Sequence, residues 1–79
     1  MITLYVLRSL ETGRRYVGIT ADLRRRLLEH GKTSSTVARQ LGPFTLIHTE
    51  KFPDYVQGRE REKFLKSGQG REWLDKQFG

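Results

Sequence analysis

The sequence contains no cysteine, so neither a disulfide nor a thiolate metal site can stabilise the fold. Long apolar runs are also missing: no stretch is long enough to span a membrane, and the first residues lack the basic and apolar segments of a signal peptide. Low-complexity segments and internal repeats are absent as well. We therefore expect one small folded domain over residues 1–79, in a cytoplasmic protein.

Acidic residues are few compared with basic ones. Fifteen Lys and Arg against nine Asp and Glu give a net charge of +6, and ten of the fifteen are arginine. Arginine pairs with phosphate through two parallel hydrogen bonds, whereas a membrane-surface helix would need large apolar residues beside its cations. The charge therefore favours a nucleic-acid partner over a membrane. A solvated basic surface without a partner is the alternative.

The first part of the chain predicts a hairpin followed by a helix. Residues 2–8 and 16–19 are rich in β-formers, and the turn residues 11–13 separate them. A helix is expected over about residues 21–30, with Thr20 as its N-cap. These elements form an antiparallel pair of strands with a helix directly behind it.

The second part predicts one more strand and two or three helices. Residues 32–40 are polar and suit a loop, with a short helix over 37–41. Alternation over 44–52 predicts a third strand, and helices are expected over 53–66 and 69–78. The fold class is therefore α/β in the α+β sense: a small three-stranded antiparallel or mixed sheet flanked by helices, in the order β-β-α-(α)-β-α-α.

The helix over 21–30 has a leucine stripe with polar residues on its flank. Leu23 and Leu27 are four apart and define the buried side. Arg26 and His30 are also four apart and lie beside that stripe, whereas Arg25 points away. Arg26 is therefore directed towards the sheet, or it extends past the leucines with its charge in water.

The helix over 53–66 places four polar residues on one face. Tyr55, Arg59, Glu62 and Lys66 follow helical spacing, and Gly58 beside them permits close packing. A carboxylate brought near the sheet in this way needs a partner. The alternative for Glu62 is an ion pair within the helix, with Arg59 or Lys66.

Several common catalytic arrangements are missing from the sequence. It has no Gly-rich phosphate loop, no Ser/His/Asp pattern and no His/Cys metal spacing. Tyr5 and Tyr16 fall on adjacent strands, where packing is their more common role, because a phenol with a pKa of about 10 is a poor base at neutral pH. His48 is expected to be a structural or a surface histidine. Arg14 and Arg15 at the hairpin tip contact a nucleic-acid backbone or face water.

Taken together, these segments resemble the GIY-YIG nuclease superfamily. Thr3-Leu4-Tyr5 and Tyr16-Val17-Gly18 stand where the family carries its two signature tripeptides. Arg26 matches the family's catalytic arginine, His30 falls where several members have a histidine, and residues 58–66 resemble the helix that carries a metal-binding glutamate. Nearly the whole chain is similar to small stand-alone members, which themselves resemble the N-terminal nuclease module of the bacterial excision-repair subunit.

The resemblance implies a divalent-metal-dependent endonuclease that hydrolyses DNA phosphodiester bonds. Glu62 would bind one Mg²⁺ or Mn²⁺ ion. Arg26 would hold the scissile phosphate. Tyr16 would orient or deprotonate the attacking water, and Tyr5 and His30 would assist it. The DNA contacts are expected from Arg14, Arg15, Gly18, Arg24, Arg59 and Lys66.

The resemblance also implies a biological setting, with departures that leave alternatives open. A monomer acting on branched, flapped or damaged DNA in repair is expected. Thr3 replaces the first signature glycine, and Ile19 replaces a lysine found in some repair-type members. A family asparagine near the end of the domain has no clear equivalent, with Gln69 and Gln77 as candidates. The alternatives are a nucleic-acid-binding module that does not cut and a subunit whose partner protein supplies DNA affinity.

Overall fold

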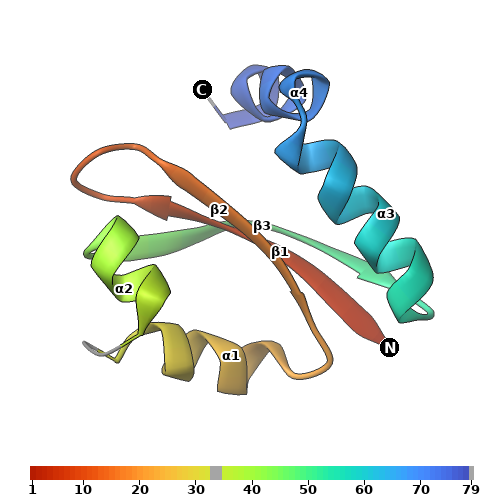
Figure 1. Cartoon of the computed structure of the whole chain (residues 1–79), viewed down its shortest axis with the longest axis horizontal. Helices are drawn as coiled ribbons and strands as arrows, with labels where there is room; N and C mark the ends of the chain where they lie inside the picture. The colour runs from red at the N-terminus through yellow and green to blue at the C-terminus, as the bar shows by residue number, and fades with distance from the viewer. Residues whose placement is uncertain (33–34, 79) are drawn as a thin grey trace.

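The computed structural model describes residues 1–32 and 35–78, so Thr33 and Ser34 in the expected polar loop lie outside the described residues. Its elements follow the predicted order, and the short second helix is present (Figure 1). They are β1 (Ile2–Ser9), β2 (Arg15–Thr20), α1 (Leu23–His30), α2 (Thr36–Leu41), β3 (Phe44–Phe52), α3 (Tyr55–Lys66) and α4 (Gly68–Phe78).

The sheet has the strand order β2-β1-β3, and both pairings are antiparallel. The predicted three-stranded sheet is therefore confirmed, and the mixed alternative is excluded. In the register of β1 with β2, Tyr5 is opposite Gly18 and Leu7 is opposite Tyr16. Because directly opposed residues share a face, the side chains of Tyr5, Leu7 and Tyr16 lie on the same side of the sheet.

Helices cover both faces of the sheet, with β1 at the centre (Figure 1). On one face, Leu4 and Val6 pack with Leu65 of α3 and Leu74 of α4. On the other face, Tyr5 and Leu7 pack with side chains of α1 and α2. Residues 4–7 of β1 are 0% exposed, which explains why this strand reads as a nearly continuous apolar run.

The start of α1 differs from the prediction. The helix begins at Leu23, and its N-cap is Asp22, whose carboxylate accepts a hydrogen bond from the amide of Arg25 at 3.1 Å. Thr20, the predicted cap, is the last residue of β2 and pairs with Thr3. Its hydroxyl accepts the amide of Asp22 at 3.1 Å and so shapes the turn before the helix. An aspartate cap also complements the positive helix terminus.

The predicted β3 and α3 are confirmed, and α4 begins at Gly68, one residue before the prediction. Asp54 caps α3 by accepting the amide of Gln57 at 2.9 Å. A Cβ atom at Gly58 would lie 3.2 Å from the side chain of Ile2, so the glycine does permit close packing. Since Ile2 and Leu4 share a face, α3 packs on the side of the sheet opposite to Tyr5.

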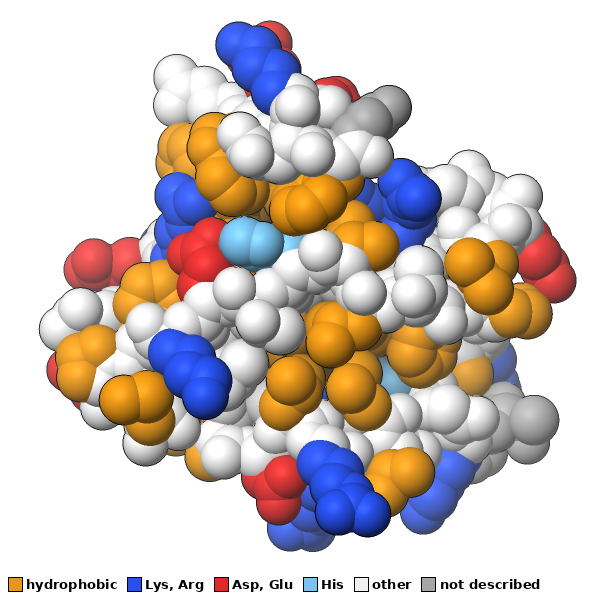
Figure 2. Space-filling view, turned by 180° about the vertical axis from the view of Figure 1, so that it is seen from behind, with side chains coloured by type: hydrophobic (Ala, Val, Ile, Leu, Met, Phe, Trp, Pro, Cys, Tyr) orange, Lys and Arg blue, Asp and Glu red, His pale blue; other side chains and the backbone are white. Residues whose placement is uncertain are grey.

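A polar cluster ties β3 to α3 and α4. Glu50 accepts two hydrogen bonds from Arg61, at 3.0 and 3.2 Å, and lies 2.7 Å from Nε2 of His48. The guanidinium of Arg61 also lies over the ring of Trp73, 4.8 Å from its centre. His48 is thus structural, which is one of the two predicted alternatives. This is the β3 side of the molecule, where Lys and Arg gather mainly around the rim of the face (Figure 2).

Among residues 1–32 and 35–78, no helix is both long and apolar enough to cross a membrane.

Candidate active site

Tyr5 and His30 form the buried floor of the candidate site. The phenol oxygen of Tyr5 lies 2.8 Å from Nε2 of His30, which is the last residue of α1. Burial raises the pKa of Tyr5 to about 12, although a hydrogen bond with Arg26 acts in the opposite direction. The phenol therefore keeps its proton at neutral pH, and it donates to Nε2 when His30 carries its own proton on Nδ1.

Tyr16 completes a cluster of three aromatic rings and lies nearer to the solvent. Its ring centre is 6.2 Å from that of Tyr5 and 5.4 Å from that of His30. Burial, followed by the charge of Arg26, lowers the pKa of His30, so its imidazole is neutral at neutral pH. Tyr16 is only partly buried, unlike Tyr5, so its hydroxyl is the one that a substrate can approach.

Gly18 leaves room for this cluster. A Cβ atom at this position would lie 2.5 Å from the phenol oxygen of Tyr5 and 3.1 Å from the ring of Tyr16. Any side chain here would therefore displace one of the tyrosines. The contribution of Gly18 is space beneath the two hydroxyl groups, since the residue itself is buried.

Arg26 reaches the cluster from α1. Interaction with Tyr5 raises the pKa of the guanidinium, which indicates that Arg26 lies near the phenol. Its outer side faces water, with 44% of the side chain exposed, and pairs with Glu29 at 3.3 Å. Arg25 is 78% exposed and pairs with the same carboxylate. Of these two arginines, only Arg26 links solvent to a tyrosine.

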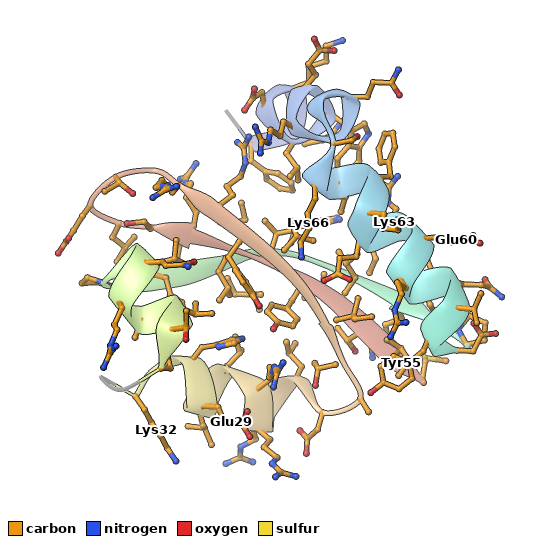
Figure 3. The ribbon with its side chains drawn as sticks, in the orientation of Figure 1. Glu29, Lys32, Tyr55, Glu60, Lys63 and Lys66 are labelled. Atoms are coloured by element: carbon orange, nitrogen blue, oxygen red, sulfur yellow. The ribbon has the colours of Figure 1, made fainter. Side chains whose placement is uncertain are left out.

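Glu62 approaches from α3 through Lys66. Its carboxylate accepts a hydrogen bond from Nζ of Lys66 at 3.1 Å, which is the intrahelical pair considered from the sequence. Nζ of Lys66 in turn lies 6.0 Å from the ring centre of Tyr16. Figure 3 shows Lys66 extending from α3 towards the strands, whereas Glu60 points away from them. Glu62 is therefore connected to the tyrosines through one lysine.

The candidate site spans the edge strand of the sheet. Tyr5, Tyr16 and Arg26 lie on the face covered by α1, whereas Glu62 and Lys66 come from α3 on the opposite face. β2 is an edge strand of the sheet, and it lies between the two groups. The candidate site is therefore arranged around this edge strand and does not form a cleft on one face of the sheet.

Two hollows flank the aromatic cluster at either end of β2. One of about 440 Å³ lies at the start of the strand and is lined by Arg15, Tyr16 and Lys66, among others. The other, of about 240 Å³, lies at the end of the strand and includes Arg26 and Tyr55. A chain lying along β2 would therefore pass from one hollow to the other across the tyrosines.

The donor set suits a hydrated divalent ion. No group of three or more His, Cys, Asp or Glu side chains that could enclose a metal occurs among the residues the structure describes. Glu62 offers a single carboxylate on a side chain that is 20% exposed. Mg²⁺ commonly binds through one or two carboxylates together with waters and substrate phosphates, so one partly exposed carboxylate fits this ion.

The predicted DNA contacts fall into three places. Arg14, Arg15 and Lys66 line the hollow at the start of β2. Arg24 lines a separate hollow with Leu28 on the outer side of α1, and Arg59 is exposed on α3. Gly18 is buried and so has little surface to offer DNA.

Gln69 and Gln77, the two candidates for the missing family asparagine, are both exposed on α4.

Arg71, which is not among the residues predicted from the sequence, lines the hollow beside Tyr16 together with Leu74. The tail carries no motif that singles out this arginine. The available signal is the spacing of three between Arg71 and Leu74, which places them on one face of α4. Leu74 is buried, whereas Arg71 is exposed at the rim of the hollow.

Comparison with known proteins gives one family and one solved structure. The model of the GIY-YIG catalytic domain matches residues 1–74. The chain is also similar to the solution NMR structure of a UPF0213 protein from Bacillus halodurans, with 30% identity and a TM-score of 0.59 over 100% of this chain and 87% of the other. None of the curated protein sequences matches the chain.

Proposed function

Since this chain belongs to the GIY-YIG family, whose domain is a nuclease domain generally dependent on a divalent metal, we propose that it is an endonuclease that hydrolyses DNA phosphodiester bonds. The observation that carries the proposal is the cluster of Tyr5, Tyr16, His30 and Arg26, joined to Glu62 across β2. Structural packing alone would not require an arginine and a carboxylate beside two tyrosines at an open sheet edge.

Arg26 has the role of holding the scissile phosphate. Its guanidinium stays charged, lies near Tyr5 and has nearly half of its surface open to solvent. The planar fork can donate two hydrogen bonds to phosphate oxygens, and these bonds strengthen as negative charge develops there. Glu29, now its ion-pair partner, is displaced by the phosphate.

Tyr16 has the role of orienting the attacking water or taking its proton. Tyr5 is unsuited to this task because burial holds its pKa near 12, so it remains a donor to its neighbours. Tyr16 lies at the solvent-facing side of the cluster, next to the cation of Lys66. Tyr5 and His30 hold the ring cluster in place.

Glu62 would hold the divalent ion, for which we propose Mg²⁺ or Mn²⁺. When bound, such an ion stabilises charge on the leaving oxygen. Lys66 must first release the carboxylate, and a substrate phosphate offers the lysine an alternative anion. This exchange would couple DNA binding to completion of the site. A role in DNA repair and a cytoplasmic location complete the proposal.

Cleavage assays test the proposal directly. Supercoiled plasmid and branched or flapped DNA are incubated with Mg²⁺ or Mn²⁺, and with chelator. Glu62→Gln and Arg26→Gln should each lower the cleavage rate by about 10²-fold or more. Two matched controls are Glu60→Gln, on the outer face of α3, and Arg39→Gln, exposed on α2, and both should keep the wild-type rate. Cleavage that continues in chelator contradicts the proposal. So does a loss of cleavage in the control variants that equals the loss in Glu62→Gln and Arg26→Gln.

The second candidate is a nucleic-acid-binding module that does not cut. The ion pair between Glu62 and Lys66 favours it, because the carboxylate already has a partner. Binding that falls steeply with salt, without any nicking by wild-type protein on these substrates, would establish this alternative.

A further inference from the structure

The hollow at the start of β2 is lined by four cations, Arg14 and Arg15 of the hairpin, Lys66 of α3 and Arg71 of α4. Two of them are neutralised, because Arg15 pairs with Asp75 at 2.6 Å and Lys66 pairs with Glu62. Among the described residues, the side chains of Arg14 and Arg71 have no acidic partner within ion-pair distance. The hollow therefore has two uncompensated positive charges, one from the hairpin and one from α4.

Tyr16 forms an aromatic wall of this hollow and is only partly buried. Val17, Leu65 and Leu74 also line it, but they are at most 5% exposed, so they back the hollow and offer little surface to a ligand. A site for phosphate alone would need only the cations, whereas an aromatic ring suits the flat, weakly polar face of a nucleobase.

The volume of the hollow is large enough for one small ligand. At about 440 Å³ the hollow falls within the range of small-ligand sites, which is about 300–1,000 Å³. A base stacked and paired within a duplex cannot enter it, because its faces are covered by its neighbours. Only an unpaired nucleotide offers both the base and the adjoining phosphates.

We propose that this hollow binds one unpaired nucleotide next to the scissile phosphate, with its base against the ring of Tyr16 and its phosphates at Arg14 and Arg71. The inference rests on the proposed function, since it places the nucleotide relative to the cleaved bond. Its consequence is a substrate class: DNA with at least one unpaired nucleotide beside the cut. Arg71 becomes a binding residue that no family motif marks.

Binding measured in chelator tests the hollow separately from cleavage. The probe is a fluorescein-labelled dT hexamer at low salt, compared with a hexamer of abasic nucleotides that keeps every phosphate. Wild-type protein should bind the abasic probe at least about fivefold more weakly, because base stacking contributes about 1–3 kcal/mol per base. In NMR spectra, the dT probe should shift the amides of Val17, Arg71 and Leu74.

Arg71→Gln and Arg14→Gln are compared with Arg39→Gln, which removes the same charge from exposed α2. Either hollow variant should lower the slope of log affinity against log salt by about 0.7, the value for one phosphate contact on a single strand. The control should leave the slope unchanged. Circular dichroism first establishes that each variant is folded.

Equal affinity for the two probes would overturn the proposal, as would equal slopes for Arg71→Gln, Arg14→Gln and Arg39→Gln. The outcome is independent of the cleavage assay. A protein that cuts DNA but shows equal slopes refutes the nucleotide site alone. A protein that binds as expected but does not cut keeps the site and refutes the nuclease.

Discussion

The two tyrosines of the candidate site differ in environment although they share the same side chain. Tyr5 is fully buried and bonded to His30, whereas Tyr16 borders the solvent and Lys66. The burial that raises the pKa of Tyr5 makes it a fixed donor. In the proposed mechanism we therefore assign the chemical step to Tyr16 and the positioning of the cluster to Tyr5.

Replacing each tyrosine by phenylalanine should separate these roles. Tyr16→Phe removes an exposed hydroxyl and should lower the cleavage rate by about 10²–10⁴-fold with little change in stability. Tyr5→Phe leaves Nε2 of His30 without its partner and should lower the free energy of unfolding by about 1–3 kcal/mol. Urea unfolding and single-turnover cleavage measure the two effects. The reverse pattern would assign the chemistry to Tyr5.

His30 should make stability depend on pH. Its pKa is lowered in the folded state, so below the ordinary value of 6.5 the unfolded chain binds more protons than the folded chain. Stability is therefore full above about pH 6.5 and decreases as pH falls towards the folded-state pKa. Urea unfolding between about pH 7 and pH 5.5 should show this loss in wild type and much less of it in His30→Gln. An identical pH dependence in the two proteins would contradict the assignment.

At the scale of elements, β1 and β2 place the site through one glycine. Gly18 lies opposite Tyr5 in the register, and its missing side chain provides the space for both tyrosine rings. On the other face, Gly58 brings α3 close to Ile2 and so brings Glu62 near the sheet. Two glycines on opposite faces thus set the separation between the two halves of the site.

Gly18→Ala should destabilise the protein by about 1–3 kcal/mol, because the new methyl group meets the Tyr5 hydroxyl and the Tyr16 ring. Cleavage should decrease as well, since one tyrosine must move. The control is Gly68→Ala, where a Cβ atom meets nothing within 4 Å, and its stability should be unchanged or slightly higher. The measurement is the thermal unfolding midpoint of each variant. Equal midpoints for Gly18→Ala and Gly68→Ala would show that Gly18 is not tightly packed.

At the scale of the whole molecule, the two edges of the sheet differ in the residues that surround them. The β2 edge carries the candidate site, and the β3 edge carries the polar cluster of Glu50, Arg61 and His48. Burial acts to raise the pKa of Glu50, but hydrogen bonds from His48 and Arg61 outweigh it, so the pKa is lowered. Arg61 precedes Glu62 in α3. The polar cluster at β3 therefore helps to fix the position of α3, which carries Glu62 to the candidate site.

Glu50→Gln should therefore lower the free energy of unfolding by about 1–3 kcal/mol without removing any group from the site. The contribution of the ionised carboxylate is present above its ordinary pKa of 4.5 and disappears as pH falls through the lower folded-state value, so the difference between wild type and variant should shrink in acid. Chemical unfolding at neutral and acidic pH measures this. Glu72→Gln, an exposed acid on α4, is the control and should match wild type.

The order of elements could be predicted from the sequence because turn residues and apolar alternation are local signals. Helical spacing relative to Leu23 and Leu27 places Arg26 on the flank of the buried stripe, but it leaves open whether the guanidinium turns towards the sheet or into water. The cap at Asp22 was mispredicted, because Thr20 and Asp22 are both good capping residues. Thr20 is not the cap because it belongs to β2, where it pairs with Thr3. The position of Arg71 depends on how α4 packs against β2, and no local pattern contains that information.

The outer side of β2 has a consequence for self-association. An edge strand presents unpaired backbone donors and acceptors, which other strands can join, and charged side chains are a common means of preventing this. Arg14, Arg15 and Lys66 lie along this edge. The cations that would bind a substrate backbone therefore also discourage a second copy from extending the sheet. A variant that loses several of them can lose activity through aggregation, so light scattering has to accompany every cleavage assay.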